Sequence, residues 1–146
     1  MAEPARTLSR RARWVWALRQ AAAWLALLVA AAIWGGKLVG WLWLVPLAGL
    51  LTGPAVVPWL RWRRWRWDVG DEGIDIRRGT LTERRTLVPW IRVQHVDTRR
   101  GLTEQALDLS TVVVHTAAGS HEIPLLDEAE AEILRERIGA LARTDA

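Results

Sequence analysis

Three histidines and the carboxylates near them are the residues of this sequence that could do chemistry. His115 and His121 flank residues 117–119, and a three-residue hairpin loop there would set the two rings opposite each other on paired strands. With Glu122 or His95 nearby, imidazoles placed in this way could share a metal ion. No third ligand follows at a diagnostic spacing. We therefore interpret His115 and His121 as half-exposed strand histidines, and we predict neither a metal site nor a cofactor.

The segment around His95 offers one further pair. His95 and Asp97 are two residues apart, so an extended strand would place both on one face, where the carboxylate could orient a base. No motif supplies a nucleophile beside them, because Ser110 and Ser120 fall at turn or strand positions. The two acids at 71–72 fit a turn better than an acid/base pair. We therefore predict no enzymatic activity and rank a metal-dependent hydrolase last.

These residues follow an N-terminal half of membrane type. Two uncharged apolar runs, residues 21–36 and 38–60, are separated only by Lys37. A membrane-spanning helix needs about 20 apolar residues. The second run has that length, and the first reaches it if residues 14–18 join it and Arg19 extends its charged head to the interface. The two runs predict a transmembrane hairpin.

Positive charge predicts the orientation of this hairpin. Nine arginines flank the two runs on their outer sides, whereas only Lys37 lies between them, and Lys and Arg remain on the cytoplasmic side. We predict a multi-pass protein of the bacterial cytoplasmic membrane with both termini in the cytoplasm. The predicted parts are a basic cytoplasmic tail at residues 1–13, a transmembrane helical hairpin at 14–60 with helices at about 14–36 and 38–60, and a cytoplasmic domain at 61–146.

Net charge differs between the two parts of the chain. Residues 1–67 hold ten Lys or Arg and one acid (+9), whereas residues 68–146 hold ten Arg and fifteen acids (−5). An acidic soluble part argues against nucleic-acid binding. The Arg-Trp alternation after the second run fits a membrane interface, where anionic lipids attract Arg and Trp lies at headgroup level. The predicted membrane-interface residues are Arg61, Trp62, Arg63, Arg64, Trp65, Arg66 and Trp67.

The period of the apolar residues then changes from helix to strand. Alternating or β-branched segments predict strands at residues 65–69, 74–77, 85–88, 91–98, 111–116 and 120–125. One helical turn is predicted within 102–109. Asp127 is a suitable N-cap for a final helix. The apolar stripe of that helix, expected to pack on the sheet, is Ile133, Leu134, Ile138 and Leu141.

About six antiparallel strands closed by one helix is the plan of a pleckstrin-homology (PH) barrel. Residues 67–79 and 87–98 resemble the bacterial PH-domain family of YdbS-like membrane proteins. The most specific family-motif residues are Val88, Pro89, Trp90, Arg92, Gln94, His95, Val96 and Asp97. The resemblance implies an N-terminal two-helix transmembrane hairpin followed by a small PH-like antiparallel β-barrel or sandwich, capped by a C-terminal α-helix. Pro89 should lie at a strand end or edge, and Trp90 should turn toward the barrel or the membrane.

The resemblance also implies an anchored interaction domain and no particular ligand. Phosphoinositide-binding PH domains use basic residues around the loop between their first two strands, whereas residues 70–73 are acidic here, so no such site is predicted. We predict a non-catalytic scaffold module at the inner leaflet that binds protein partners or itself. The alternative is a small subunit of a membrane transport or envelope-stress complex.

The predicted partners are membrane lipids and other membrane proteins. Six arginines could face anionic headgroups or form a solvated surface: Arg77, Arg78, Arg84, Arg85, Arg99 and Arg100. Two glycine pairs have the small-xxx-small spacing, Gly36 with Gly40 and Gly49 with Gly53, which favours close helix approach. We therefore expect a homo-oligomer, or a hetero-complex with a similar membrane protein.

Overall fold

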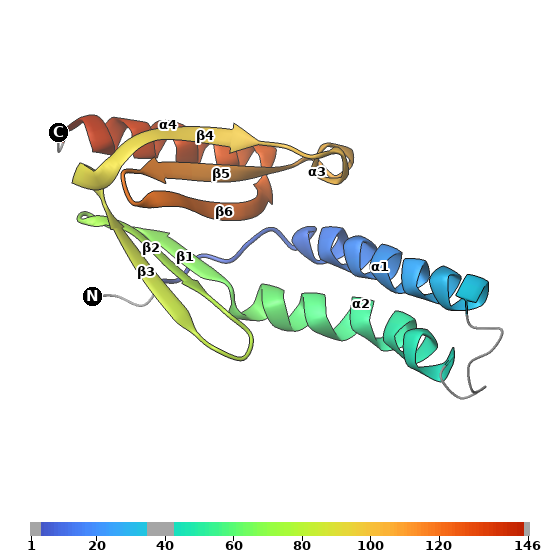
Figure 1. Ribbon diagram of the computed structural model, residues 1–146. Coiled ribbons are helices and arrows are strands. Elements are labelled where there is room, and N and C mark those ends of the chain that lie inside the picture. Colours follow the sequence, from blue (N-terminus) through green and yellow to red (C-terminus); the bar gives the residue numbers. More distant parts are fainter. Residues whose placement is uncertain (1–3, 35–42, 145–146) are drawn as a thin grey trace. The chain divides into compact units, whose positions relative to one another are not determined.

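The computed structural model describes residues 4–34 and 43–144 (Figure 1). The chain forms two compact units. One holds the N-terminal residues up to Ala12 together with the chain from Arg61 onward, and the other is Arg13–Leu60. The predicted outer turn, with Lys37 and the pair Gly36 and Gly40, lies outside the described residues.

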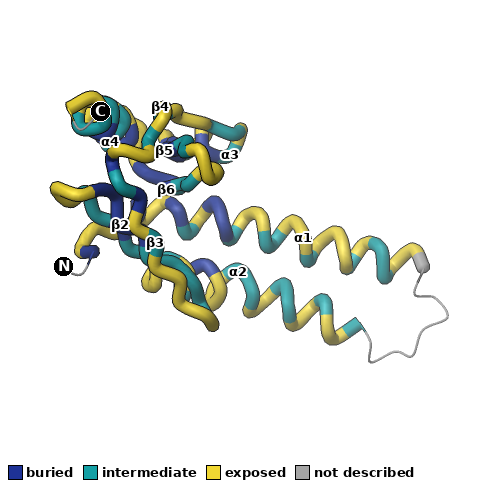
Figure 2. Tube along the Cα trace, turned by 60° about the vertical axis from the view of Figure 1, so that its left-hand side comes forward, coloured by how far each residue is buried: buried dark blue, intermediate teal, exposed yellow. Residues whose placement is uncertain are grey.

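Two long helices provide the membrane-type part. Helix α1 is Ala12–Trp34 and helix α2 is Leu44–Arg64. Both are long and apolar enough to cross a membrane, and only 6% of each candidate span is buried, so their apolar side chains lie mostly at the surface (Figure 2). Helix α2 extends past the predicted end at residue 60 because its last turn is rich in Arg, which favours helix and interacts well with the C-terminal end of the helix dipole.

Two glycines of α2 face a tryptophan of α1 within this unit. A Cβ added at Gly49 would lie 2.6 Å from the Trp24 ring, and one at Gly53 would lie 2.7 Å from Trp24 Nε1. Real Cβ contacts are essentially never this short, so a side chain at either position would force the Trp24 ring to move. The small-xxx-small pair of α2 is therefore used inside the hairpin, and association of two chains through it is not required to explain it.

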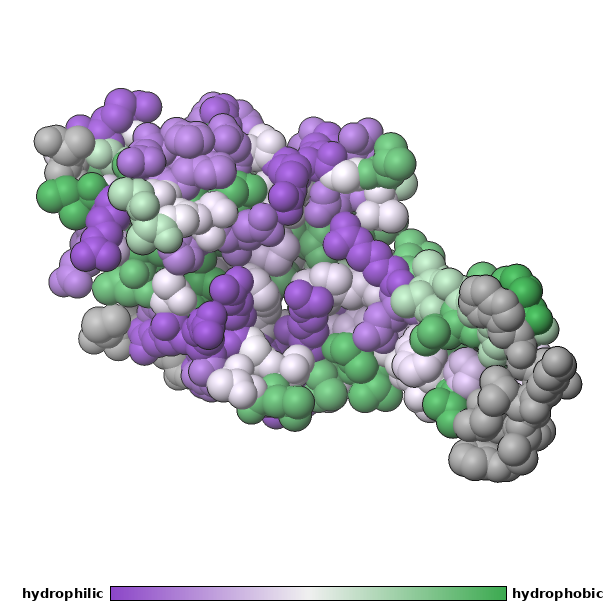
Figure 3. Space-filling model, in the orientation of Figure 1, coloured by the Kyte–Doolittle hydropathy of each residue, from purple (hydrophilic) through white to green (hydrophobic). Residues whose placement is uncertain are grey.

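The second unit contains two three-stranded antiparallel sheets and a C-terminal helix, as the resemblance implied. The strands are β1 (Arg66–Val69), β2 (Gly73–Arg78), β3 (Arg84–Pro89), β4 (Val93–Arg99), β5 (Leu109–Thr116) and β6 (Gly119–Asp127). The sheet orders are β1-β2-β3 and β4-β5-β6. A short helix α3 (Leu102–Ala106) confirms the predicted helical turn. Hydrophilic residues dominate the surface of the sheets and of α4 in Figure 3, whereas the hairpin is mostly white to green.

Helix α4 (Glu128–Thr144) covers the second sheet through contacts with β4, β5 and β6. Its buried residues are Ala131, Leu134 and Ile138, whereas Ile133 is 67% exposed. The prediction that Ile133 belongs to the packing stripe was therefore wrong. Residues 131, 134 and 138 follow the i, i+3, i+7 spacing of one helix face, and residue 133 lies outside that line.

The N-terminal segment is part of the β-rich unit. Arg6 and Trp67 exchange both main-chain hydrogen bonds, at 3.1 and 3.0 Å, and so add a bridge to the free side of β1. Leu8 is 2% exposed, and its carbonyl oxygen accepts a 2.9 Å hydrogen bond from the Trp62 indole. The Ser9 hydroxyl donates to Asp127 Oδ1 at 2.9 Å, at the junction of β6 and α4. Residues 4–12, expected to form a tail, thus form a strap across this unit.

Candidate functional site

The family-motif stretch links the two sheets. Strand β3 ends at Pro89, Trp90 opens a single 3-10 turn (η3, Trp90–Arg92), and β4 begins at Val93. Pro89 has no N–H, so its place at the strand end agrees with the prediction. Trp90 is 1% exposed, and its indole donates to the Asp71 carbonyl at 2.9 Å. Trp90 therefore fixes the corner between the sheets to the β1–β2 loop.

The strand before this corner presents apolar side chains at a sheet edge. Strand β3 pairs with β2 on one side only, since it is the last strand in the order β1-β2-β3. Leu87 on β3 is 42% exposed and Ile91 in η3 is 77% exposed. An edge strand exposes main-chain N–H and C=O groups that can pair with another extended segment. The edge of β3 with Leu87 and Ile91, hereafter the β3 edge, is thus suited to bind a peptide strand.

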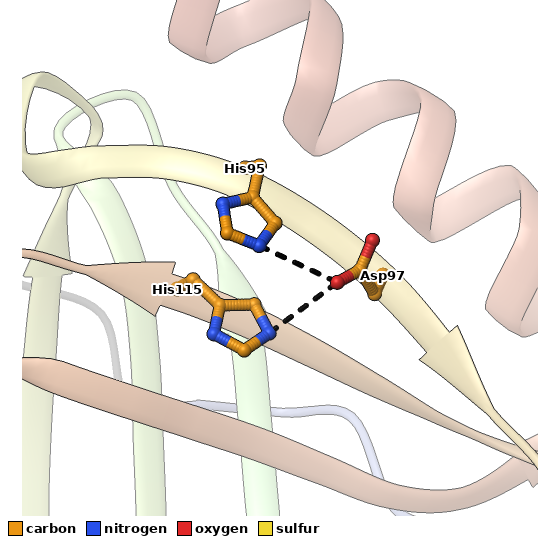
Figure 4. A group of neighbouring side chains, drawn as sticks. All are labelled: His95, Asp97 and His115. Carbon is orange, nitrogen blue, oxygen red and sulfur yellow. Dashed lines mark ion pairs between the residues drawn. The ribbon is translucent and has the colours of Figure 1, made fainter.

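The strand after the corner brings three polar side chains together (Figure 4). The register of β4 with β5 shifts between Val93 and His95, and this bulge places His95 directly opposite His115. Asp97, two residues farther along β4, lies on the same face, as predicted. One carboxylate oxygen, Asp97 Oδ2, lies 3.4 Å from Nε2 of each histidine. The two rings stack with centroids 4.2 Å apart and planes 10° from parallel.

The predicted opposition of His115 and His121 was wrong. Thr116 pairs with Gly119, so the hairpin turn holds two residues, and the partner of His115 is Ser120. The tight turn is possible because Gly119 takes a φ of +133°, a region that favours glycine. A register shifted by one residue turns His121 to the opposite face of the sheet from His115. His95, on the neighbouring strand, takes the place expected for His121.

The predicted membrane-interface residues differ in exposure, and Trp62 and Arg66 are half-buried. Arg61, Arg63 and Arg64 are exposed at the end of α2. Trp65 and Trp67, in contrast, are 6% and 0% exposed, and they belong to the core of the β-rich unit. The exposed set can reach headgroups, whereas the two buried indoles cannot.

Most of the arginines expected to face headgroups form ion pairs with acids. The pairs with measured contacts are Arg77 with Glu83, Arg85 with Asp75, Arg99 with Glu122 at 3.0 Å, and Arg100 with Glu128. The hydrogen bond from Arg77 holds the pKa of Glu83 below its usual value. Arg78 lies 6.0 Å from the Trp65 ring centroid. This pairing favours the alternative of a solvated charged surface for these arginines, and the β1–β2 loop carries the exposed acids Asp71 and Glu72.

Two exposed apolar helices, two small antiparallel sheets and a closing helix together define a membrane-anchored PH-like module. A match to the bacterial PH domain family spans residues 12–142, and the chain belongs to that family. It is 39% identical over 110 residues to the UPF0699 transmembrane protein YdbS of Bacillus subtilis (strain 168), which covers 75% of this chain and 67% of the relative. No solved structure matches the chain significantly. The chain is therefore a membrane-associated PH-like protein.

Proposed function

We propose that this protein is a non-catalytic interaction module, tethered at the inner face of the bacterial cytoplasmic membrane, that binds an extended segment of another membrane protein or of a second copy at its β3 edge. The observation that supports this most directly is the β3 edge, which has no second strand partner among residues 4–34 and 43–144 and carries the exposed side chains of Leu87 and Ile91. Strand addition of this kind draws affinity from main-chain hydrogen bonds and specificity from alternate side chains.

Tethering makes a modest edge sufficient for binding. Chains held in one membrane meet at a high effective concentration, so a short paired strand can give a stable complex. Pro89 closes the far end of the edge, and Arg84 and Arg85 place charge near its beginning. Charges and proline are the means by which natural edge strands limit uncontrolled pairing. The edge is therefore selective for a matched segment.

The strap supports the proposed topology. Residues 4–11 precede α1, residues 65–67 follow α2, and both segments belong to one folded unit. Only a hairpin that crosses the bilayer twice returns the chain to the side from which it started. The surplus of arginine on these flanks supports a cytoplasmic location for that side.

Neither serine near the histidine cluster is hydrogen-bonded as an activated nucleophile among the described residues. Ser120 is the cross-strand partner of His115, yet among the described residues its hydroxyl makes no hydrogen bond to that ring. Ser110 is buried within β5 at 2% exposure. A nucleophile activated by the His95, Asp97 and His115 cluster would need a hydrogen bond to one of the imidazoles.

Cysteine crosslinking tests the β3 edge, because the chain has no cysteine of its own. We would compare Leu87→Cys with the control Ile133→Cys, which replaces an exposed apolar residue of α4. In native membranes, a thiol crosslinker should join Leu87→Cys chains to a partner far more efficiently than Ile133→Cys chains, although both react with maleimide. Crosslinking that persists in vesicles of purified protein identifies a second copy as the partner. Equal crosslinking at the two positions would refute the proposal.

A further inference from the structure

The His95, Asp97 and His115 cluster has a geometry that its own hydrogen bonding does not explain. The two Nε2–Oδ2 distances are both 3.4 Å, longer than the roughly 2.7–3.2 Å of good N–H···O hydrogen bonds. All three potential ligand atoms lie within 4.8 Å of one another. The two imidazole nitrogens and the carboxylate oxygen therefore lie close together, but they are too far apart for strong hydrogen bonds.

The spacing agrees with that of ligands around a small cation. Zinc binds imidazole nitrogen and carboxylate oxygen at about 2.0–2.2 Å, and the edge of a tetrahedron is about 1.6 times the bond length, which gives about 3.3–3.6 Å between ligand atoms. The observed 3.4 Å falls within that interval. We propose that His95, Asp97 and His115 form a surface site for a divalent transition-metal ion such as Zn²⁺, with water completing the coordination. Two imidazoles and one carboxylate suit such ions better than Mg²⁺ or Ca²⁺.

The strands position these ligands before an ion arrives. The β4 bulge fixes His95 opposite His115, and near-parallel ring stacking keeps the two imidazoles side by side. Strand alternation fixes Asp97 on the same face. Because the ligands come from two hydrogen-bonded strands, only ring rotation is needed to aim the nitrogens. The side chains of His95 and Asp97 are 60% and 61% exposed, so an ion and its waters can enter directly.

The charges around the site allow a cation to bind. Helix α4 faces the cluster with Glu132, Arg135 and Glu136, which line the two shallow depressions beside the three ligands. Arg135 would repel an ion, but its guanidinium forms a bidentate pair with Glu132, with Nε 3.2 and 3.1 Å from the two carboxylate oxygens. Arg99, beside Asp97 on β4, is paired with Glu122 at 3.0 Å. Arg135 and Arg99 are thus matched by carboxylates, Arg143 and Glu136 both line the depression at His95, and Asp97 supplies a negative charge to the ion.

Titration of Zn²⁺ into the full chain in detergent micelles, without a polyhistidine tag, tests the site. We expect one Zn²⁺ per chain near neutral pH. His115→Ala and Asp97→Asn should each weaken binding by at least about 10–100-fold, the loss that mutation of even a supporting outer-shell residue causes. His121→Ala is the matched control, because it removes the chain's remaining histidine from the opposite face and should leave the affinity unchanged.

Two additional measurements keep the test decisive. Co²⁺ should give the intense visible absorption of a low-coordinate nitrogen and oxygen site in the wild type and in His121→Ala, and it should lose that absorption in His115→Ala. Zn²⁺ should raise the melting temperature of the wild type and of His121→Ala but not that of His115→Ala, since a ligand stabilises a fold that binds it. Circular dichroism confirms that each variant is folded. An absence of saturable binding to wild type, or equal losses in His121→Ala and His115→Ala, would overturn the proposal.

Discussion

Truncation of the Leu8 side chain tests whether the strap, residues 4–12, packs on the β-rich unit and stabilises it. The residue precedes the first membrane helix, yet its side chain is 2% exposed within the β-rich unit. Replacement of a buried Leu by Ala costs about 2–5 kcal/mol, because apolar contact is lost and a cavity remains. A change of 1 kcal/mol shifts the melting temperature of a domain of 60–100 residues by about 4–8 °C. We expect Leu8→Ala to lower the melting temperature of the β-rich unit by at least about 8 °C.

The neighbouring residue provides a matched control. Thr7 is exposed, so Thr7→Ala should change the stability by less than about 0.5 kcal/mol. The assay is thermal unfolding of the full chain in detergent, followed by the β-sheet signal in circular dichroism. Hydrogen exchange of β1 provides a local readout, because Arg6 donates to and accepts from Trp67 on that strand. If Leu8→Ala and Thr7→Ala melt alike, residues 4–12 form a solvated tail and the topology argument built on the strap fails.

Three further predictions concern the corner, the hairpin and the start of α4. Trp90→Phe keeps an aromatic ring but loses the indole hydrogen bond and some volume, so it should cost about 1–2 kcal/mol, measured by thermal unfolding; an unchanged midpoint would contradict the anchoring role. Gly49→Leu should destabilise the helical signal in detergent by about 1–3 kcal/mol, whereas the exposed Ala55→Leu should not. Burial, and secondarily the charge of Asp127, raises the pKa of Glu130. The folded state then binds a proton more tightly than the unfolded state, so stability falls as pH rises from the ordinary carboxyl pKa through the raised one. Glu130→Gln should reduce the dependence of the melting temperature on pH in this range. An unchanged dependence would show that Glu130 does not cause it.

Local periodicity explains why the elements could be predicted from the sequence. Apolar runs and flanking arginines predicted both helices, and strand period predicted segments of all six strands. The prediction of strand at residues 91–92 was wrong, because the chain turns there through η3 to pass from one sheet to the other. The short helix α3 and the end of β3 at Pro89 were also predicted correctly, because turn and proline chemistry act over a few residues. These features depend on neighbours in the chain and not on tertiary pairing.

The features that sequence could not predict depend on register or on distant pairing. The opposition of His95 and His115 requires the β4 bulge, and the two-residue turn before Gly119 turns His121 to the other face; a change of one residue in either feature would turn a ring to the opposite face. The strap requires Ser9 to meet Asp127, 118 residues away. No local pattern around residues 4–12 signals such contacts, apart from a single apolar Leu8 among polar neighbours.

The strap also determines the order in which this protein can be completed. Its contacts join Arg6 to Trp67 and Ser9 to Asp127, so they form only after the chain between them has been made. That intervening chain includes both apolar helices, each long and apolar enough to cross a membrane. Contacts of such high sequence separation form slowly because the intervening loop must first be closed. In the proposed topology, insertion of the hairpin shortens that closure, since it returns residue 61 to the side of the membrane on which residue 12 lies. That topology predicts that the strap contacts form after membrane insertion, so the strap links insertion to the folding of the PH-like unit.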